Sequence, residues 1–292
     1  YLLFFPATVL LYFLLPRPCK NLWLLAASWF FYLCAGPDCF AFLLCATLVT
    51  YTGARLLERR DGASRKALLT LLLTLLFGTL FLFKYLDFAF SLAERVLDAA
   101  GLSFSSPALD LILPAGISFY LFMAAGYLID VYRGDRAAEH SFLLCALFLS
   151  FFPHVISGPI ARAGGLIPQF REVHRFDYDK FRAGLLRFLW GAFKKLCIAD
   201  RLAVLVNAVF AAPGDFGWLQ VIAAACAFSV QIYCDFSAYS DMALGSAEAM
   251  GFHLMENFRT PYFSRSIAEF WRRWHISLSA WFRDYLYIPL GG

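Results

Sequence analysis

The chain has 292 residues, of which 61% are hydrophobic, 18% are aromatic and only 16% are charged. Soluble globular domains are nearer half apolar and a quarter charged, so this composition excludes an ordinary soluble enzyme. The formal net charge of +4 is modest. We therefore expect membrane lipid as a partner of the chain and no nucleic acid.

Long stretches of the chain contain no Lys, Arg, Asp or Glu. At a rise of about 1.5 Å per residue, such runs of 16 to 19 residues approach the roughly 30 Å hydrocarbon core of a bilayer. The sequence therefore predicts an all-α, polytopic integral membrane protein. The runs are residues 1–16, 21–37, 39–54, 67–83, 111–129 and 216–234.

The short connections between the first runs alternate in charge. Residues 55–66 hold five basic and two acidic side chains, and residues 17–20 are also basic, whereas the turn at 36–38 has no basic residue. The positive-inside rule then places 17–20 and 55–66 in the cytoplasm. By the same alternation we expect 84–110 outside and 132–140 inside.

In chain order, residues 1–90 predict four conventional spanning helices with short loops. Residues 91–109 follow as an extracytoplasmic loop or an interfacial helix. A fifth span is expected at about 110–130, bent by Pro114-Ala115-Gly116.

The segment 141–165 carries Pro153, His154, Gly158 and Pro159 within apolar surroundings. Proline and glycine at membrane depth are tolerated only where protein or a water-filled cavity satisfies the freed backbone groups. A broken or re-entrant helix is therefore predicted here. His154 could line a cavity or be a satisfied core histidine.

Residues 180–196 predict a strongly amphipathic, interfacial helix. Lys180, Arg187 and Lys194 repeat every seven residues on one face, and the segment contains no acidic residue. One interpretation is a helix on the cytoplasmic leaflet, anchored to anionic lipid. The other is a cationic rim for a phosphate-bearing acyl donor.

Two carboxylates, Asp235 and Asp241, follow the apolar run 216–234, with Tyr239 between them. Carboxylates at such depth are energetically costly and usually face a cavity or a partner. Alternatively, the span ends at Cys234 and the rest is a polar interface. Both interpretations fit the spacing.

The stretch Ser266–Glu269 reads as a capping box, which predicts a helix from about residue 267 to the mid-280s, before Pro289. Glu269 and Arg273 have the spacing of an i,i+4 ion pair. One face of this helix would carry Trp271, His275, Leu278 and Phe282, and another would carry Arg272, Ser279 and Arg283.

A histidine packed among aromatic side chains should be neutral, because burial and nearby arginines disfavour the charged imidazolium. Neutral His275 could then accept a proton from a hydroxyl, as attack on an acyl group requires. Alternatively, Trp and Arg form an interface belt and His275 only bonds a backbone carbonyl. The other histidines are weaker candidates.

The stretch "FWRRWHISLSAWFRDYLYIPLGG" occupies residues 270–292. Four further blocks precede it, at residues 113–134, 151–170, 191–200 and 231–245. In these five blocks, taken in order, the chain resembles the membrane-bound O-acyltransferase family, and in particular its bacterial branch similar to alginate O-acetyltransferase. The resemblance covers essentially the whole chain.

The resemblance implies a multi-pass enzyme of the bacterial inner membrane. It would move an acyl group, usually acetyl, from a cytoplasmic thioester such as acetyl-CoA to an extracytoplasmic hydroxyl on a polysaccharide or an intermediary protein. Acetyl-CoA would be a substrate, and we expect no bound cofactor or metal. His275 would line the channel in a supporting role, and the family's principal histidine would follow Gly292. Further channel residues would be Asp235, Tyr239, Asp241, Trp271, Arg272, Arg273 and Trp274.

We interpret residues 1–292 as a single membrane-embedded domain and as the N-terminal portion of a longer protein. Its parts would be a four-helix region over 1–90 and a channel-forming region over 91–292. Two other functions fit the same residues: a transporter or channel, and a non-catalytic scaffold that recruits a periplasmic acyltransferase.

Overall fold

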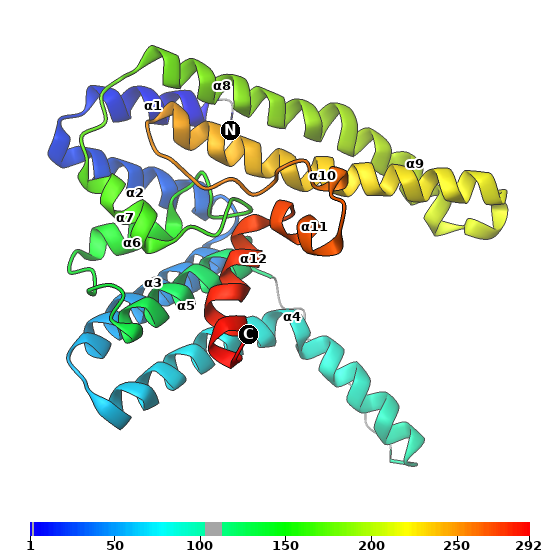
Figure 1. The fold of residues 1–292 in the computed structure, drawn as a ribbon, viewed down its shortest axis with the longest axis horizontal. Coiled ribbons are helices and arrows are strands. Elements are labelled where there is room, and N and C mark those ends of the chain that lie inside the picture. Colours follow the sequence, from blue (N-terminus) through cyan, green and yellow to red (C-terminus); the bar gives the residue numbers. More distant parts are fainter. Residues whose placement is uncertain (2, 103–112) are drawn as a thin grey trace. The chain divides into compact units, whose positions relative to one another are not determined.

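The computed structural model describes residues 1, 3–102 and 113–292, and every regular element in this part of the chain is a helix (Figure 1). This confirms the predicted all-α class. Two compact units are present. Unit 1 comprises Tyr1–Leu24 and Pro153–Gly292, and unit 2 comprises Leu25–Phe152.

Unit 2 is built on α3, which packs against three neighbouring helices. Gly53 lies on α3 where an added Cβ would meet the Leu72 side chain of α4 at 2.8 Å, so glycine permits the close approach of these two helices. The helices of this unit are the later part of α2 (Arg17–Leu33), α3 (Pro37–Glu58), α4 (Gly62–Ala99), α5 (Ile117–Arg133) and α6 (Phe142–Ser150).

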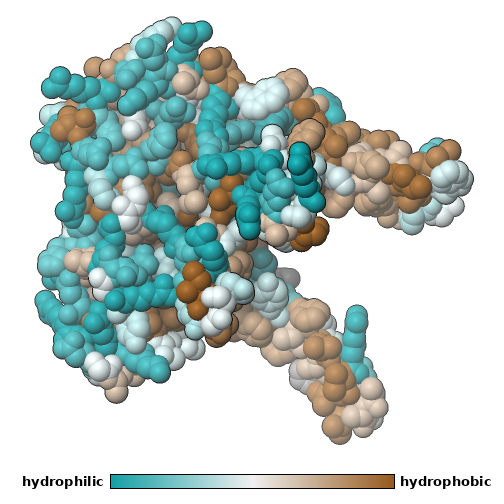
Figure 2. Space-filling view, in the orientation of Figure 1, coloured by the Kyte–Doolittle hydropathy of each residue, from teal (hydrophilic) through white to brown (hydrophobic). Residues whose placement is uncertain are grey.

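Three helices of the described chain, α3, α4 and α10 (Trp218–Ala249), are long and apolar enough to cross a membrane. Figure 2 shows apolar side chains gathered over the end of α4 that follows residue 80 and over the neighbouring ends of α9 (Asp200–Ala211) and α10. Large apolar side chains such as Phe88 and Trp218 are exposed there. The chain is thus a multi-pass membrane protein.

The first 99 residues form four helices with short loops, as predicted, but not four spans. Helix α1 (Phe4–Leu14) has 11 residues, a length of about 16 Å that cannot cross a core of about 30 Å. Pro16 follows its C-cap residue Leu15, whose backbone is already extended. The uncharged run 1–16 therefore contains one short helix and a turn.

The boundary expected at residue 91 is absent, because α4 continues to Ala99. The rest of that expected loop, from residue 103, lies outside the described residues, as do residues 110–112 of the expected fifth span. Pro114–Gly116 do not bend a helix. Gly116 has φ of 70° and precedes α5, so this tripeptide forms the turn that starts the helix.

Unit 1 is dominated by the packing of α8 (Tyr178–Phe193) along α10 (Figure 1). An added Cβ on Gly191 would meet the Ala238 carbonyl oxygen at 2.7 Å, and one on Gly184 would meet the Ala249 nitrogen at 2.5 Å. Small residues therefore let the two backbones approach closely, as at helix crossings inside membranes.

Unit 1 also contains α1 and several short elements. The predicted break after α6 is confirmed, since residues 151–162 are irregular and α7 (Ala163–Arg171) follows them. His154 lies in this break and is fully buried. The other elements are η1 (Lys194–Ala199), η2 (Pro213–Asp215), η3 (Pro261–Phe263), α11 (Ile267–Arg273), α12 (Ile276–Phe282), η4 (Arg283–Tyr287) and η5 (Ile288–Leu290).

Candidate functional site

The helix predicted from residue 267 to the mid-280s is broken at its centre. Helix α11 ends at Arg273, Trp274 is extended, and α12 begins at Ile276. His275 lies between the two helices with φ of 44° and ψ of 54°, a left-handed conformation that is costly for any residue with a Cβ. The prediction that Trp271 and His275 share one helical face is therefore wrong.

The start of α11 follows the predicted cap. The Ser266 hydroxyl accepts the Glu269 amide at 3.1 Å, and Glu269 also pairs with Arg273. The second half of the capping box differs, because Glu269 accepts the amide of Arg265 at 2.8 Å and not that of Ser266. The cap fixes where α11 begins and thus where the chain reaches His275.

His275 is enclosed, with 9% of its surface exposed. The Phe236 ring of α10 meets the imidazole edge-on at a centroid separation of 4.7 Å. Trp274 lies in an aromatic cluster beside it, with Phe258 at 5.1 Å and Phe270 at 5.5 Å. The imidazole is thus held in an apolar environment, as the aromatic neighbours in the sequence indicate.

Asn257 holds His275 from the irregular segment after α10. The His275 Nδ1 atom lies 3.2 Å from Asn257 Oδ1. The same oxygen accepts the Ser277 amide at 3.1 Å and the Ser277 hydroxyl at 2.7 Å. The Asn257 carbonyl accepts the Ile276 amide at 2.9 Å, and Asn257 Nδ2 donates to Ser240 of α10 at 3.3 Å.

These bonds assign the tautomer of His275. A backbone amide can only donate, so the Ser277 amide identifies Oδ1 as the acceptor end of Asn257. His275 Nδ1 must then carry the proton that it donates to Oδ1. In the neutral ring Nε2 is consequently the nitrogen with the lone pair.

Burial lowers the pKa of His275 to about 4, because removal from water disfavours the charged imidazolium. The ring is therefore neutral at physiological pH, in agreement with the sequence prediction. The buried surroundings and the Asn257 bond act together, since the first removes the charge and the second orients the ring.

A second polar cluster lies on the neighbouring face of α10. The helix continues past Cys234 to Ala249 and carries both Asp235 and Asp241. Asp241 accepts Lys194 at 2.6 Å and Arg187 Nε at 3.0 Å. Arg187 also makes a bidentate pair with Glu256, at 2.7 and 2.6 Å. Because Glu256 precedes Asn257, this pair anchors the segment that holds His275.

These pairs also correct the interpretation of residues 180–196 as an open cationic face. Lys194 is buried, and both Lys194 and Arg187 are turned toward the carboxylates of α10 and its following segment. The third member of the seven-residue repeat, Lys180, is exposed at the start of α8.

The other predicted site residues are not brought to His275. Asp235 pairs with Lys195 at 2.6 Å, and the Lys195 ammonium lies 5.4 Å from the centre of the Tyr239 ring. Trp271 is 52% exposed and Arg272 is also exposed, while Arg273 pairs with Glu269.

Sequence reasoning missed four residues of the His275 pocket: Phe236, Ser240, Asn257 and Ser277. Phe236 and Ser240 are one helical turn apart on α10, a spacing visible in the sequence. Asn257 lies in irregular chain, 18 positions from His275, where no periodicity could have found it.

A family model described as the membrane-bound O-acyltransferase family matches residues 135–292, which is more than half of the chain and includes the His275 pocket. The chain belongs to the membrane-bound O-acyltransferase family. This confirms the resemblance seen in the sequence.

Two relatives match nearly the whole chain, and a third matches part of it. It is 44% identical over 301 residues to the probable alginate O-acetylase AlgI of Pseudomonas putida, covering 99% of this chain and 60% of that protein. It is 34% identical over 321 residues to the peptidoglycan O-acetyltransferase of Helicobacter pylori, with coverages of 99% and 60%. A teichoic acid D-alanyltransferase of Streptococcus thermophilus is 30% identical over 181 residues, or 60% of this chain and 43% of that protein. The chain spans 60% of the length of the first two relatives.

Proposed function

We propose that the full-length protein is a membrane O-acetyltransferase. It transfers an acetyl group from a cytoplasmic thioester, acetyl-CoA, to a hydroxyl of an extracytoplasmic polysaccharide or of an intermediary periplasmic protein. The observation that carries the proposal is the similarity over 99% of the chain to proteins named alginate O-acetylase and peptidoglycan O-acetyltransferase. A location in the bacterial inner membrane is part of the same proposal, because only there does a cytoplasmic thioester face a periplasmic acceptor across one bilayer.

Transfer of an acyl group to a hydroxyl needs a group that takes the proton of that hydroxyl. The oxygen attacks the thioester carbonyl, the carbon–sulfur bond breaks, and the thiolate leaves and takes a proton. A neutral imidazole whose Nε2 carries the lone pair suits this environment, because it accepts a hydrogen bond without placing a charge among aromatic rings. We assign His275 a supporting role of this kind, which orients the acceptor hydroxyl.

The remaining predicted residues act around this group in the proposal. The carboxylates of α10 hold α8 and the Glu256–Asn257 segment in place, which supports a positioning role for Asp241. Asp235, Tyr239, Trp271, Arg272, Arg273 and Trp274 stay predicted channel residues.

The test uses the full-length protein in proteoliposomes with labelled acetyl-CoA and a glycan acceptor, with and without a periplasmic acyltransferase partner. His275→Gln should lower acetyl transfer by about 10²-fold, the lower end of the range for a positioned proton acceptor. The matched control is His253→Gln, since the His253 side chain is exposed and should leave the rate unchanged.

Three outcomes would contradict the proposal in different ways. Full activity of His275→Gln would remove the role of this histidine. Solute movement across the vesicles without acetyl transfer would identify a transporter. Acetyl transfer that requires the added partner, and that His275→Gln leaves unchanged, would identify a scaffold.

A further inference from the structure

We propose that unit 1 carries a binding site for one anionic phospholipid, with the headgroup at Arg175 and Lys180 and an acyl chain between α1 and α8. The site is separate from the His275 pocket and does not depend on the proposed acetyl transfer. Two adjoining cavities define it, one polar and one apolar.

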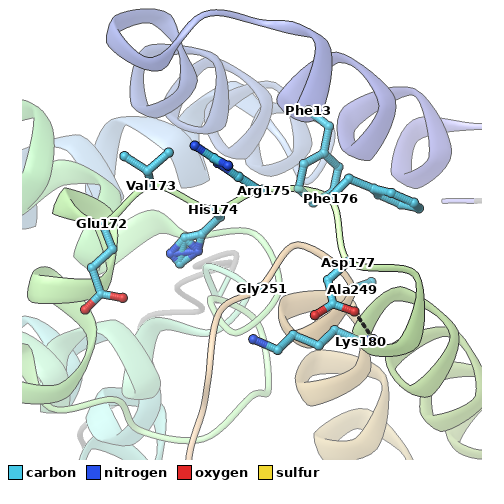
Figure 3. Close-up of a pocket in the computed structure, with 10 residues that line it drawn as sticks. All are labelled: Phe13, Glu172, Val173, His174, Arg175, Phe176, Asp177, Lys180, Ala249 and Gly251. Carbon is cyan, nitrogen blue, oxygen red and sulfur yellow. Dashed lines mark hydrogen bonds between the residues drawn. The ribbon is translucent and has the colours of Figure 1, made fainter.

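The polar cavity has a volume of about 430 Å³ and lies where the segment between α7 and α8 passes the end of α10 (Figure 3). His174, Arg175 and Lys180 line it, together with Asp177 and Gly251. Figure 3 shows the Lys180 ammonium reaching below Asp177 toward the chain at Gly251. Burial lowers the pKa of His174, the Glu172 carboxylate opposes this shift, and the Lys20 and Lys180 ammonium groups lower the pKa further, so charges of both signs act on this ring.

The cations of this cavity are available to an anion. Within residues 1, 3–102 and 113–292, no carboxylate forms an ion pair with Arg175 or Lys180. Asp177 is engaged as the N-cap of α8, where it accepts the amides of Asp179 at 3.0 Å and Lys180 at 3.2 Å.

A neighbouring cavity of about 400 Å³ shares Glu172 and adds further cations. Five basic side chains and two acidic ones line the two cavities together, which gives this surface an excess of positive charge. The basic residues are Arg17, Lys20, Arg171, Arg175 and Lys180, and the acidic ones are Glu172 and Asp177.

The apolar cavity is a groove of about 760 Å³ between α1 and α8. Val9, Leu10 and Leu185 line it, and it shares Phe13 and Phe176 with the polar cavity. The rings of Phe13 and Phe176 meet edge-on at 5.3 Å, so they form the boundary between the two. Its volume is within the range of small-molecule sites, about 300–1,000 Å³.

The polar cavity and the apolar groove lie side by side, and this indicates the chemistry of the ligand that would fill them. A ligand that fills both cavities must carry an anionic group at one end and a hydrocarbon chain directly attached, which is the composition of a phospholipid. Residues 17–20 are predicted to be cytoplasmic, and the cytoplasmic leaflet is the one that carries anionic lipid. A long-chain acyl thioester has the same two parts and is the alternative that the experiment must separate.

The test titrates the full-length protein in detergent with phosphatidylglycerol or phosphatidylcholine and measures bound lipid by native mass spectrometry. Phosphatidylglycerol should bind the native protein more tightly. Arg175→Gln with Lys180→Gln should weaken its binding about thirtyfold, because each cation near a lipid surface contributes about fivefold. The control pair is Arg182→Gln with Arg201→Gln, two exposed arginines outside both cavities, which should bind as the native protein does.

A second pair of variants tests the groove. Leu10→Trp should block the acyl chain and weaken both lipids roughly tenfold, equivalent to lost contact with about two methylenes. Leu11→Trp, the adjacent position of α1 that does not line the groove, should have no effect. Both side chains are exposed, with fractions of 61% and 39%, so the fold should tolerate either change.

The proposal is overturned if phosphatidylcholine binds as well as phosphatidylglycerol, or if the charge variants bind like their controls. It is also overturned if palmitoyl-CoA displaces phosphatidylglycerol from the native protein at equal concentration, because the site would then hold an acyl donor. None of these measurements depends on acetyl transfer, so failure here leaves the proposed enzyme activity untouched.

Discussion

Two neighbouring faces of α10 hold polar groups in opposite ways. Ser237 and Asp241 face α8 and η1, where Arg187 and Lys194 complete a network of hydrogen bonds and ion pairs. Phe236 and Ser240, one position earlier on each turn, face the His275 pocket, where the hydrogen bonds of Asn257 join neutral groups. On the first face, charged side chains are paired with opposite charges. On the second face, the titratable group, His275, is neutral.

The difference indicates what each face does. Removing one partner of a buried ion pair leaves an uncompensated charge, so the fold should be sensitive to the loss of Lys194 from the α8 face. The proton affinity of the His275 imidazole is instead lowered by its burial among apolar side chains. The Arg187–Glu256 pair connects the two, since Glu256 is followed directly by Asn257.

The largest expected effect is on the charged face. Lys194→Met removes the buried partner of Asp241 and Ser237 and should lower the free energy of unfolding by about 3 kcal/mol, as breaking a buried pair does. Lys195→Met is the matched control. Its partners Asp235 and Asp200 have side chains 41% and 45% exposed, so the loss should stay below about 1 kcal/mol. Thermal unfolding of the detergent-solubilised proteins measures both losses of stability. Equal losses from the two variants would show that burial of Lys194 makes no difference.

The neutral face should make the fold sensitive to acid. The pKa of His275 is about 4 when folded and near 6.5 in an unfolded chain. Between these values the unfolded chain binds the additional proton, so the free energy of unfolding falls as the pH falls. The contribution is fully present above about pH 6.5, and about 2 kcal/mol should be lost by pH 5.

The measurement compares unfolding of the native protein and His275→Gln at pH 7 and pH 5. The difference between the two proteins isolates His275, because His174, whose pKa burial also lowers, contributes equally to both. Asn257→Asp is the informative second variant, since a carboxylate beside the imidazole should raise the pKa of His275 and reduce the loss at pH 5. Parallel losses in the native protein and in His275→Gln would show that the pocket does not hold a neutral imidazole.

The sequence could predict most helices and the state of His275, because both depend on local composition. Uncharged runs indicate apolar helices, and aromatic neighbours indicate burial. The break at Trp274–His275 could not be predicted, because no Gly or Pro marks it and the apolar period of 3.6 continues across it. The break exists because Asn257 satisfies the amides of Ile276 and Ser277 from outside the helix.

The sequence also did not predict that helix α10 continues past Cys234. Asp235 and Asp241 fitted either carboxylates that face a cavity or partner or the polar end of a span, since the sequence does not show that Lys195 and Lys194 lie opposite them. Lys194 and Asp241 are 47 positions apart. Ion pairs of this kind are decided by the crossing of α8 and α10, which the small residues on both helices permit.

The smallest expected effect concerns the outer side of the neutral pocket. Trp271 and Trp274 are three positions apart, but Trp271 is 52% exposed and Trp274 is packed against Phe258 and Phe270. Trp271→Ala should change the free energy of unfolding by no more than about 0.5 kcal/mol, as for other surface substitutions, whereas Trp274→Ala should cause a clearly larger loss. Unfolding and acetyl transfer are measured on the same samples. Unchanged unfolding with reduced transfer would assign Trp271 to the substrate path, and a loss of stability equal to that of Trp274→Ala would show that the tryptophan is part of the pocket wall after all.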